Sequence, residues 1–196
     1  MNADEYVKRH QEIHSFLQRG FTDLFCLQML GEMEKSDGPF NPEVSRVLAH
    51  ISEVLKSDLC LIVCKTCLDD NSDNSLTKLR SNANKYFNKR YKKKYFAEIS
   101  ADDKEAIRTM RNKVLAHSDY ERESITILVS TMGKMLYEAR DYCNDLYFPD
   151  IYENAFSFTD RELMDIQLTS RSQLAKLLKQ GAYPTTDNKE DGNKNV

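Results

Sequence analysis

The stretch LCLIVC, residues 59–64, is apolar on every side although 30% of the chain is charged. A helix that is apolar all round has to be enclosed by other elements, so this stretch predicts the centre of the core. Apolar residues continue upstream at three-and-four spacing, at Val44, Val47, Leu48, Ile51 and Leu55. The pattern predicts a central helix that begins at about Pro42, a residue type favoured at the first helical position, and reaches about Cys67.

Amphipathic helices are predicted on both sides of this centre. Residues 3–34 carry apolar side chains at three-and-four spacing, and a second long apolar face extends from Ile125 to Leu146. The sequence Ser36–Pro39 is expected to end the first of these helices. Further helix starts are predicted at Ser75, at Ser100, at Glu123 or Ser124, and at Thr159. Thr159 and Glu162 have the spacing of a capping box, and Gly181 is placed to end the last helix.

Six Gly and four Pro in 196 residues indicate that turns are scarce and helices are long. No strand pattern extends beyond a few residues. The sequence therefore predicts an all-α fold, a helical bundle of about five or six helices. Residues 1–150 would form the bundle, residues 151–182 a C-terminal helical extension, and residues 183–196 a polar, disordered tail.

The composition bears on where the chain acts. Its net charge is -3, so the chain as a whole is not a polycation. It contains no run of 18 apolar residues, so no membrane span is predicted. The first five residues lack the basic-then-apolar pattern of a signal peptide. We therefore expect a cytoplasmic protein.

Five cysteines, an odd number without a secretion signal, predict reduced thiols. Cys64 and Cys67 form a C-x-x-C, with Cys60 one turn earlier. Zinc is one interpretation of this spacing, and free buried thiols are the other. The second is favoured because the three residues share one helical stripe and no second ligand pair is present. In the polar loop 69–74, Asn74 stands where a calcium loop requires Gly, which argues against calcium binding there. From the sequence as a whole, neither a metal nor a cofactor is expected.

Bases gather in one segment, Asn74–Ala97, which contains no acid. Its bases are Lys78, Arg80, Lys85, Lys89, Arg90, Lys92, Lys93 and Lys94. Since the whole chain carries -3 and this segment +8, the remainder carries -11. Aromatic residues, among them Tyr86 and Tyr91, alternate with the bases. Cations with stacking rings favour single-stranded nucleic acid binding, and the alternative is a solvated basic face whose rings belong to the core.

A second chemical pattern is the stretch RNKVLAHSD, residues 111–119. Arg111 can fork onto phosphate oxygens, His117 can exchange a proton near neutral pH, and Asn112 adds a neutral donor and acceptor. The stretch is therefore a candidate site for phosphate chemistry. The alternative is that its basic residues stand in a last helical turn, facing the negative end of the helix dipole.

Arg111 and His117 do not face each other on an ideal helix, because six residues at 3.6 per turn leave them about 120° apart. They converge only if the helix ends near His117 or if a second copy supplies one of them, which predicts a homodimeric cleft. Ser118 and Asp119 are expected to cap or end the helix. Asp58, beside the central apolar stretch, either supports Arg111 or His117, or is a surface carboxylate.

The stretch resembles the signature of the HEPN superfamily, whose helical domains carry an Arg followed after four to six residues by a His. Its Arg-Asn start and Ala-His-Ser-Asp end are similar to the AbiU-like abortive-infection branch, and the resemblance extends loosely from about Ser45 to Tyr147. It implies a metal-independent RNA endonuclease, active as a homodimer. Arg111 would hold the scissile phosphate, Asn112 would be the polar residue after it, and His117 the acid or base.

The resemblance also implies a toxin or phage-defence role, with an antitoxin protein as a possible partner. The bases expected to guide RNA are Lys85, Lys89, Arg90, Lys92, Lys93 and Lys94. Some relatives in this superfamily lack activity, so a second hypothesis remains. In it, the chain is a non-catalytic helical module that binds RNA, nucleotide or a protein partner.

Overall fold

The computed structural model describes residues 2–36, 42–69, 72–88, 94–115, 122–152 and 158–182. Within these ranges the fold is all-α, with six α-helices and no strand, which confirms the predicted class. The helices are α1 (Ala3–Ser36), α2 (Pro42–Val63), α3 (Leu76–Phe87), α4 (Ala101–Leu115), α5 (Arg122–Asp145) and α6 (Asp160–Ala182). Over the same ranges, no helix combines the length and the apolar composition that crossing a membrane requires.

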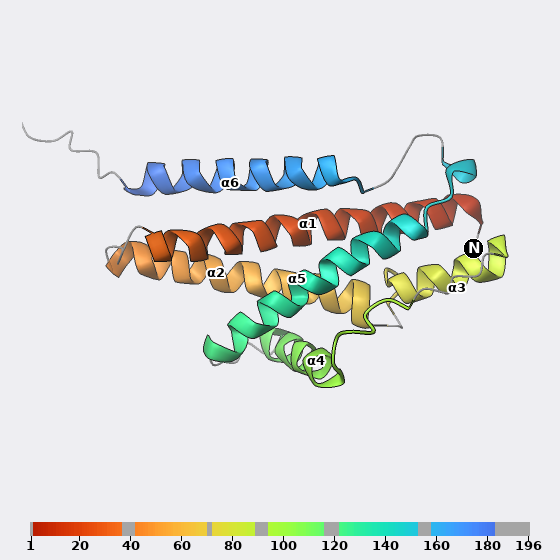
Figure 1. Ribbon diagram of the computed structural model, residues 1–196, viewed down its shortest axis with the longest axis horizontal. Helices are drawn as coiled ribbons and strands as arrows, with labels where there is room; N and C mark the ends of the chain where they lie inside the picture. The colour runs from red at the N-terminus through yellow and green to blue at the C-terminus, as the bar shows by residue number, and fades with distance from the viewer. Residues whose placement is uncertain are drawn as a thin grey trace, which may run out of the picture.

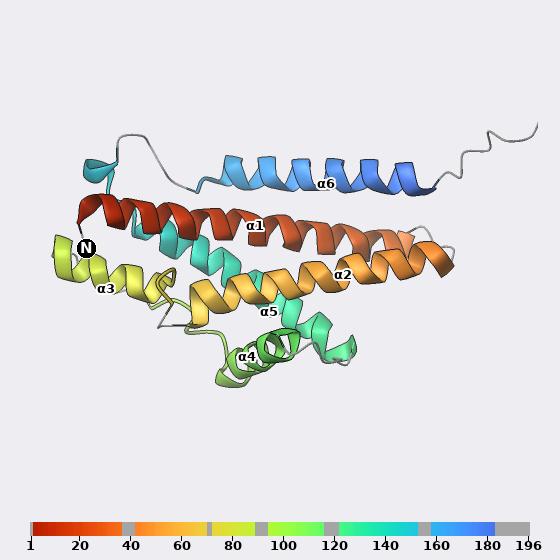
Figure 2. The same cartoon turned by 180° about the vertical axis from the view of Figure 1, so that it is seen from behind.

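The long helix α1 is the axis of the arrangement (Figure 1). It packs against α2, α5 and α6, and α6 and α2 run along opposite sides of it in both views (Figure 2). The shorter helices α3 and α4 lie at the other side of the α1–α2 layer from α6. The C-terminal extension thus covers the bundle along α1.

The centre of the core lies where the apolar stretch predicts it. Five of the six residues in 59–64 are at most 3% exposed. The exception, Leu61, is half-buried. Gly20 of α1 permits a close crossing here, because a Cβ atom at this position would lie 3.0 Å from Leu136 Cδ2 and 3.3 Å from Ile62 Cγ2.

Three predicted helix starts are confirmed by their capping contacts. The hydroxyl oxygen of Ser75 accepts a hydrogen bond from the Lys78 amide at 3.1 Å. Ser100 and Thr159 accept in the same way from the amides three residues later, at 3.0 and 3.1 Å. Each cap satisfies an amide that the first helical turn leaves without a partner.

Two helix ends differ from the prediction. The turn after α2, Cys64–Leu68, is π-helical, and the Asp69 amide donates to the Cys64 carbonyl at 2.8 Å. Such wide turns are rare and leave no mark in apolar spacing. At the other end of the chain, α6 includes Gly181, which was expected to end it. Glycine permits the left-handed end of a helix but does not force it.

His10 and His14 of α1 are buried, which supports a structural role for both. The Nε2 atom of His10 lies 2.8 Å from the Cys143 carbonyl, and burial lowers the pKa of His10 to about 4. His14 lies under the Phe158 ring, with 4.8 Å between ring centroids, and its Nε2 is 3.5 Å from Glu162. His10 thus joins α1 to α5, and His14 joins α1 to the start of α6.

Candidate functional site

The structure describes the first half of the 111–119 stretch. Arg111 and Asn112 lie in the last turn of α4, and the helical backbone continues to Leu115. His117, Ser118 and Asp119 lie outside the described residues. The predicted convergence of Arg111 and His117 therefore stays a prediction.

Arg111 is half-buried, and its guanidinium turns toward the neighbouring amide. Its Nε and Nη2 atoms donate to Asn112 Oδ1 at 3.3 and 3.2 Å. Among the described residues, no carboxylate lies within ion-pair distance of Arg111. A guanidinium carries five N–H donors, so the contact with Asn112 leaves donors for an anion.

Two thiols, one in α2 and one in the π-helical turn that follows it, support the turn that carries Arg111. Cys60 Sγ donates to the Ile107 carbonyl at 3.5 Å, and Cys64 Sγ approaches the same oxygen at 3.8 Å. Ile107 is four residues before Arg111, so in an α-helix its carbonyl is also the acceptor of the Arg111 amide. The pair therefore fixes the position of α4 at the base of the candidate site.

The pKa values of the two thiols are affected by the positive charge of this turn. The pKa of Cys64 is lowered, first by its side-chain interaction with Cys60 and then because Arg111 and Arg108 lie nearby. Burial opposes this lowering at Cys64. The pKa of Cys60 is raised, first by its side-chain interaction with Cys64 and then by burial. All three thiols of the C-x-x-C region are buried, and none is in a disulfide. The sequence pattern predicts these thiols only as metal ligands or as core residues, although their four-residue spacing places Cys60 and Cys64 on one helical stripe.

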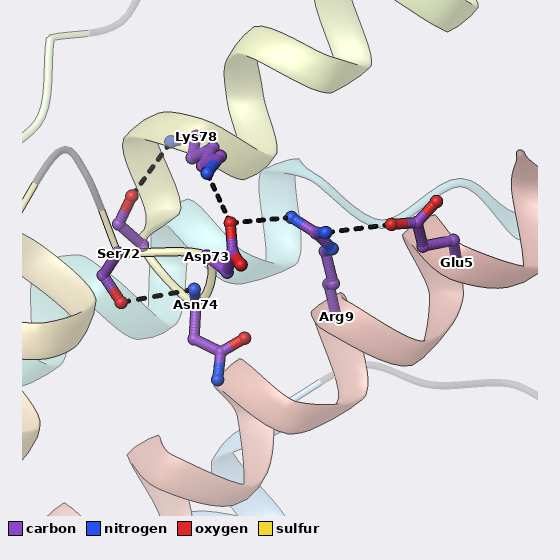
Figure 3. A network of polar contacts seen from close by, with 7 residues as sticks. Glu5, Arg9, Ser72, Asp73, Asn74 and Lys78 are labelled. Carbon is purple, nitrogen blue, oxygen red and sulfur yellow. Dashed lines mark hydrogen bonds and ion pairs between the residues drawn. The ribbon is translucent and has the colours of Figure 1, made fainter. Parts of the chain in front are cut away.

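The start of the basic helix α3 is tied to α1 by a polar network (Figure 3). Asp73 accepts from Lys78 and, at 3.4 Å, from Arg9, which also pairs with Glu5 at 2.9 Å. Ser72 accepts from the Asn74 amide at 3.3 Å. Lys78 therefore has a local partner, and the network holds α3 against the bundle.

The bases expected to guide RNA are only partly described. Lys85 and Lys94 are exposed, whereas Lys89, Arg90, Lys92 and Lys93 lie outside the described residues. The ammonium of Lys85 lies 5.2 Å from the Tyr86 ring centroid, and Tyr86 is 44% exposed. The end of α3 thus presents a cation and a ring to solvent.

Other rings of the basic segment belong to the core. Tyr95 stacks on Tyr142 at 4.1 Å between centroids, and Phe87 contacts Tyr6 at 5.0 Å. Phe96 is buried, and Lys104 of α4 donates to its carbonyl at 2.7 Å. The alternation of rings and bases is therefore explained mainly by packing, which anchors the end of the segment to α4.

Asp58 lies at the α1–α2 contact. Both of its carboxylate oxygens accept from the Arg19 guanidinium of α1. It stands two residues before Cys60, which is about 200° round the helix, so it faces away from the thiols under Arg111. Beside it, Asp23 is buried at 6% exposure, and the two acids line a pocket of about 440 Å³.

Asp23→Asn should stabilise the protein at alkaline pH. Burial, followed by the hydrogen bond and charge of Asp58, raises the pKa of Asp23 from 3.8 to about 8. The folded state then binds a proton that the unfolded state has lost. The free energy of unfolding should therefore fall between about pH 4 and pH 8, by at most about 1.4 kcal/mol per pH unit.

In the Asp23→Asn variant this contribution is absent, so its melting temperature should exceed that of the wild type at pH 8 and converge with it near pH 4. Asp165→Asn, at an exposed position of α6, is the control for loss of a charge. Thermal unfolding from pH 4 to 9 measures all three proteins. A wild type and an Asp23→Asn variant with parallel pH profiles would contradict the carboxyl-pair interpretation.

Comparison of the chain with protein-family models, curated proteins and solved structures finds no match. The fold and site define an all-α bundle in which the helix that follows the basic segment ends in an arginine-bearing turn. Any assignment of function therefore depends on the chemistry of these residues.

Proposed function

We propose that the chain is a metal-independent RNA endonuclease of a toxin or phage-defence type. The observation that carries the proposal is the Arg111 guanidinium, which stands at the end of α4 with an amide beside it and no described carboxylate as its ion-pair partner. It is followed six residues later by His117. This pairing of a permanent cation with a titratable group is what phosphate transfer by an internal nucleophile requires.

In the proposed reaction the RNA supplies its own nucleophile. The 2′-hydroxyl loses its proton to a base and attacks the adjacent phosphorus. As the O2′–P bond forms, the P–O5′ bond breaks and the departing 5′-oxygen takes up a proton. His117 serves as acid or base, while Arg111 neutralises charge on the two non-bridging oxygens. The products are a 2′,3′-cyclic phosphate and a 5′-hydroxyl, and the reaction needs no metal ion.

The proposed enzyme is a homodimer with the two 111–119 stretches facing one cleft. The support is the 120° separation of Arg111 and His117 on an ideal helix, which a second copy can compensate. An antitoxin partner and a cytoplasmic location belong to the same proposal, because a free ribonuclease inside a cell would need restraint.

The second candidate is a non-catalytic helical module that binds RNA, nucleotide or a protein. Two observations favour it. Lys78 and Arg80 have contacts within the bundle, with Asp73 and Tyr142 respectively, and most described rings of the basic segment are packed. In that case the segment would serve the fold more than RNA cleavage.

Incubation of the purified protein with total RNA separates the two candidates. The nuclease should fragment RNA in the presence of EDTA, because its nucleophile and its proton carrier come from RNA and protein. The module should shift RNA in a gel or leave it unchanged, without fragments.

A further inference from the structure

One face of α2 carries apolar side chains that the described residues leave uncovered. Val47 is 58% exposed and Val54 is 54% exposed, although Leu48 and Leu59 on the neighbouring face are buried. Val47, Ile51 and Val54 lie within about 60° of one another on a helix, so they form a single ridge. The ridge is about 10 Å long, since seven residues separate its ends.

An apolar groove adjoins the N-terminal end of this ridge. It has a volume of about 510 Å³ and lies between α2 and the C-terminal part of α6, with Val44, Ile51 and Leu174 among its lining residues. These parts of the two helices lie at the same end of the molecule (Figures 1 and 2). Leu177 of α6 also lines it and is 65% exposed, although it is one turn from the buried Leu174. A ridge and a groove therefore share one face.

The charges beside the ridge are arranged for a reversed copy of the same helix. Arg46 and Glu53 are both exposed and, seven residues apart, lie on the same flank of α2. In a parallel two-fold pair these flanks of the two copies would lie on opposite sides of the contact and would not face each other. In an antiparallel pair, Arg46 of each copy faces Glu53 of the other, which gives two opposite-charge contacts about one two-fold axis.

We propose that this face binds a second copy of the chain, with α2 antiparallel to α2 and the axis close to His50. In this register the Val54 side chain of each copy falls between the positions of Val44 and Val47 of the other, at the mouth of the groove. Ridge, groove and charge order are each self-complementary, as an isologous contact requires.

This contact is separate from the proposed nuclease cleft. Cys60, the thiol of α2 that donates to α4, lies at least 120° round α2 from each residue of the ridge. The contact on α2 therefore does not depend on RNA cleavage.

Light scattering on a size-exclusion column tests the contact through Val54→Glu. The wild type should elute as an assembly, and Val54→Glu should halve its mass at 50 µM, because each buried carboxylate would lack a partner. Met164→Glu is the matched control, since Met164 is 62% exposed on α6 and not in this ridge. It should leave the mass unchanged.

The charge order gives a second, independent variant. Arg46→Glu should weaken the assembly at least tenfold by opposing Glu53, and Arg46→Glu with Glu53→Arg should restore the wild-type mass. Both positions are exposed, and Glu53→Arg removes a surface ion pair with Lys56 (3.2 Å) that contributes about 1 kcal/mol or less, so these proteins should keep a melting temperature close to that of the wild type. A wild type that is monomeric at 50 µM would overturn the proposal, and the groove would then be a site for a different protein. An assembly whose mass is unchanged by both Val54→Glu and Arg46→Glu would also overturn it, because the contact between copies would then lie on another surface.

Discussion

His117→Ala should lower the rate of RNA cleavage by about 10²–10⁴-fold, the usual cost of removing a general acid or base. The proposed chemistry requires a group that exchanges protons near neutral pH, and the alanine side chain has none. The rate is measured with purified protein and a labelled RNA under single-turnover conditions. The variant should keep the wild-type melting temperature, because a residue that lines a cleft contributes little to the core.

Arg111→Lys should also be strongly impaired, because one ammonium cannot fork onto two phosphate oxygens. Arg108→Lys is the matched control. Arg108 lies on the same helix and contacts Glu105 at 3.5 Å, so its replacement should change the rate little. A His117→Ala protein that melts far below the wild type, together with a wild type that never cleaves RNA, would make His117 a core residue. The binding module would then be the better account.

Mixing the two inactive variants tests the shared cleft. If Arg111 of one copy works with His117 of the other, a mixed dimer of Arg111→Lys and His117→Ala holds one intact pair. Random exchange gives half mixed dimers, so about a quarter of the wild-type rate should return. Recovery of no activity would mean that each copy supplies both residues of its own site.

Replacing Lys92, Lys93 and Lys94 together with Gln should weaken RNA binding and flatten its salt dependence. Each cation that neutralises a phosphate of a single strand adds about 0.7 to the slope of log affinity against log salt, so three should remove about 2. Fluorescence anisotropy from 50 to 300 mM salt measures the slope.

The control for this change carries the same three-charge difference elsewhere on the surface. Lys8, Lys134 and Lys176 are exposed on α1, α5 and α6, outside the basic segment. Their combined replacement with Gln should leave the slope close to that of the wild type. Equal slopes for the two triple variants would mean that residues 85–94 form a solvated basic face and do not guide RNA.

The architecture was predictable because its signals are local. A run of residues that is apolar on every side has to be enclosed, and residues 59–64 form the centre of the core. A hydroxyl three residues before a free amide makes a cap, and Ser75, Ser100 and Thr159 do so. Neither argument needs knowledge of distant residues.

The contacts that shape the candidate site were harder to predict because they join distant parts of the chain. Spacing placed Cys60 and Cys64 on one stripe, but it could not show that both reach the carbonyl of Ile107, more than 40 residues later. In the same way, Asp58 was recognised as a carboxylate beside the core, whereas its partner Arg19 and its neighbour Asp23 come from another helix. The relation of Arg111 to His117 stays a prediction.

The most direct test of the proposed nuclease compares two substrates that differ by one atom. The wild-type protein is incubated, in EDTA, with an RNA oligonucleotide that it cleaves and with the same oligonucleotide carrying a single 2′-deoxynucleotide on the 5′ side of the cleaved bond. We predict that the RNA yields fragments ending in a 2′,3′-cyclic phosphate, identified by mass spectrometry, and that the 2′-deoxy substrate stays intact at that bond. Cleavage of both substrates at the same bond, or no cleavage of any RNA, would contradict the account.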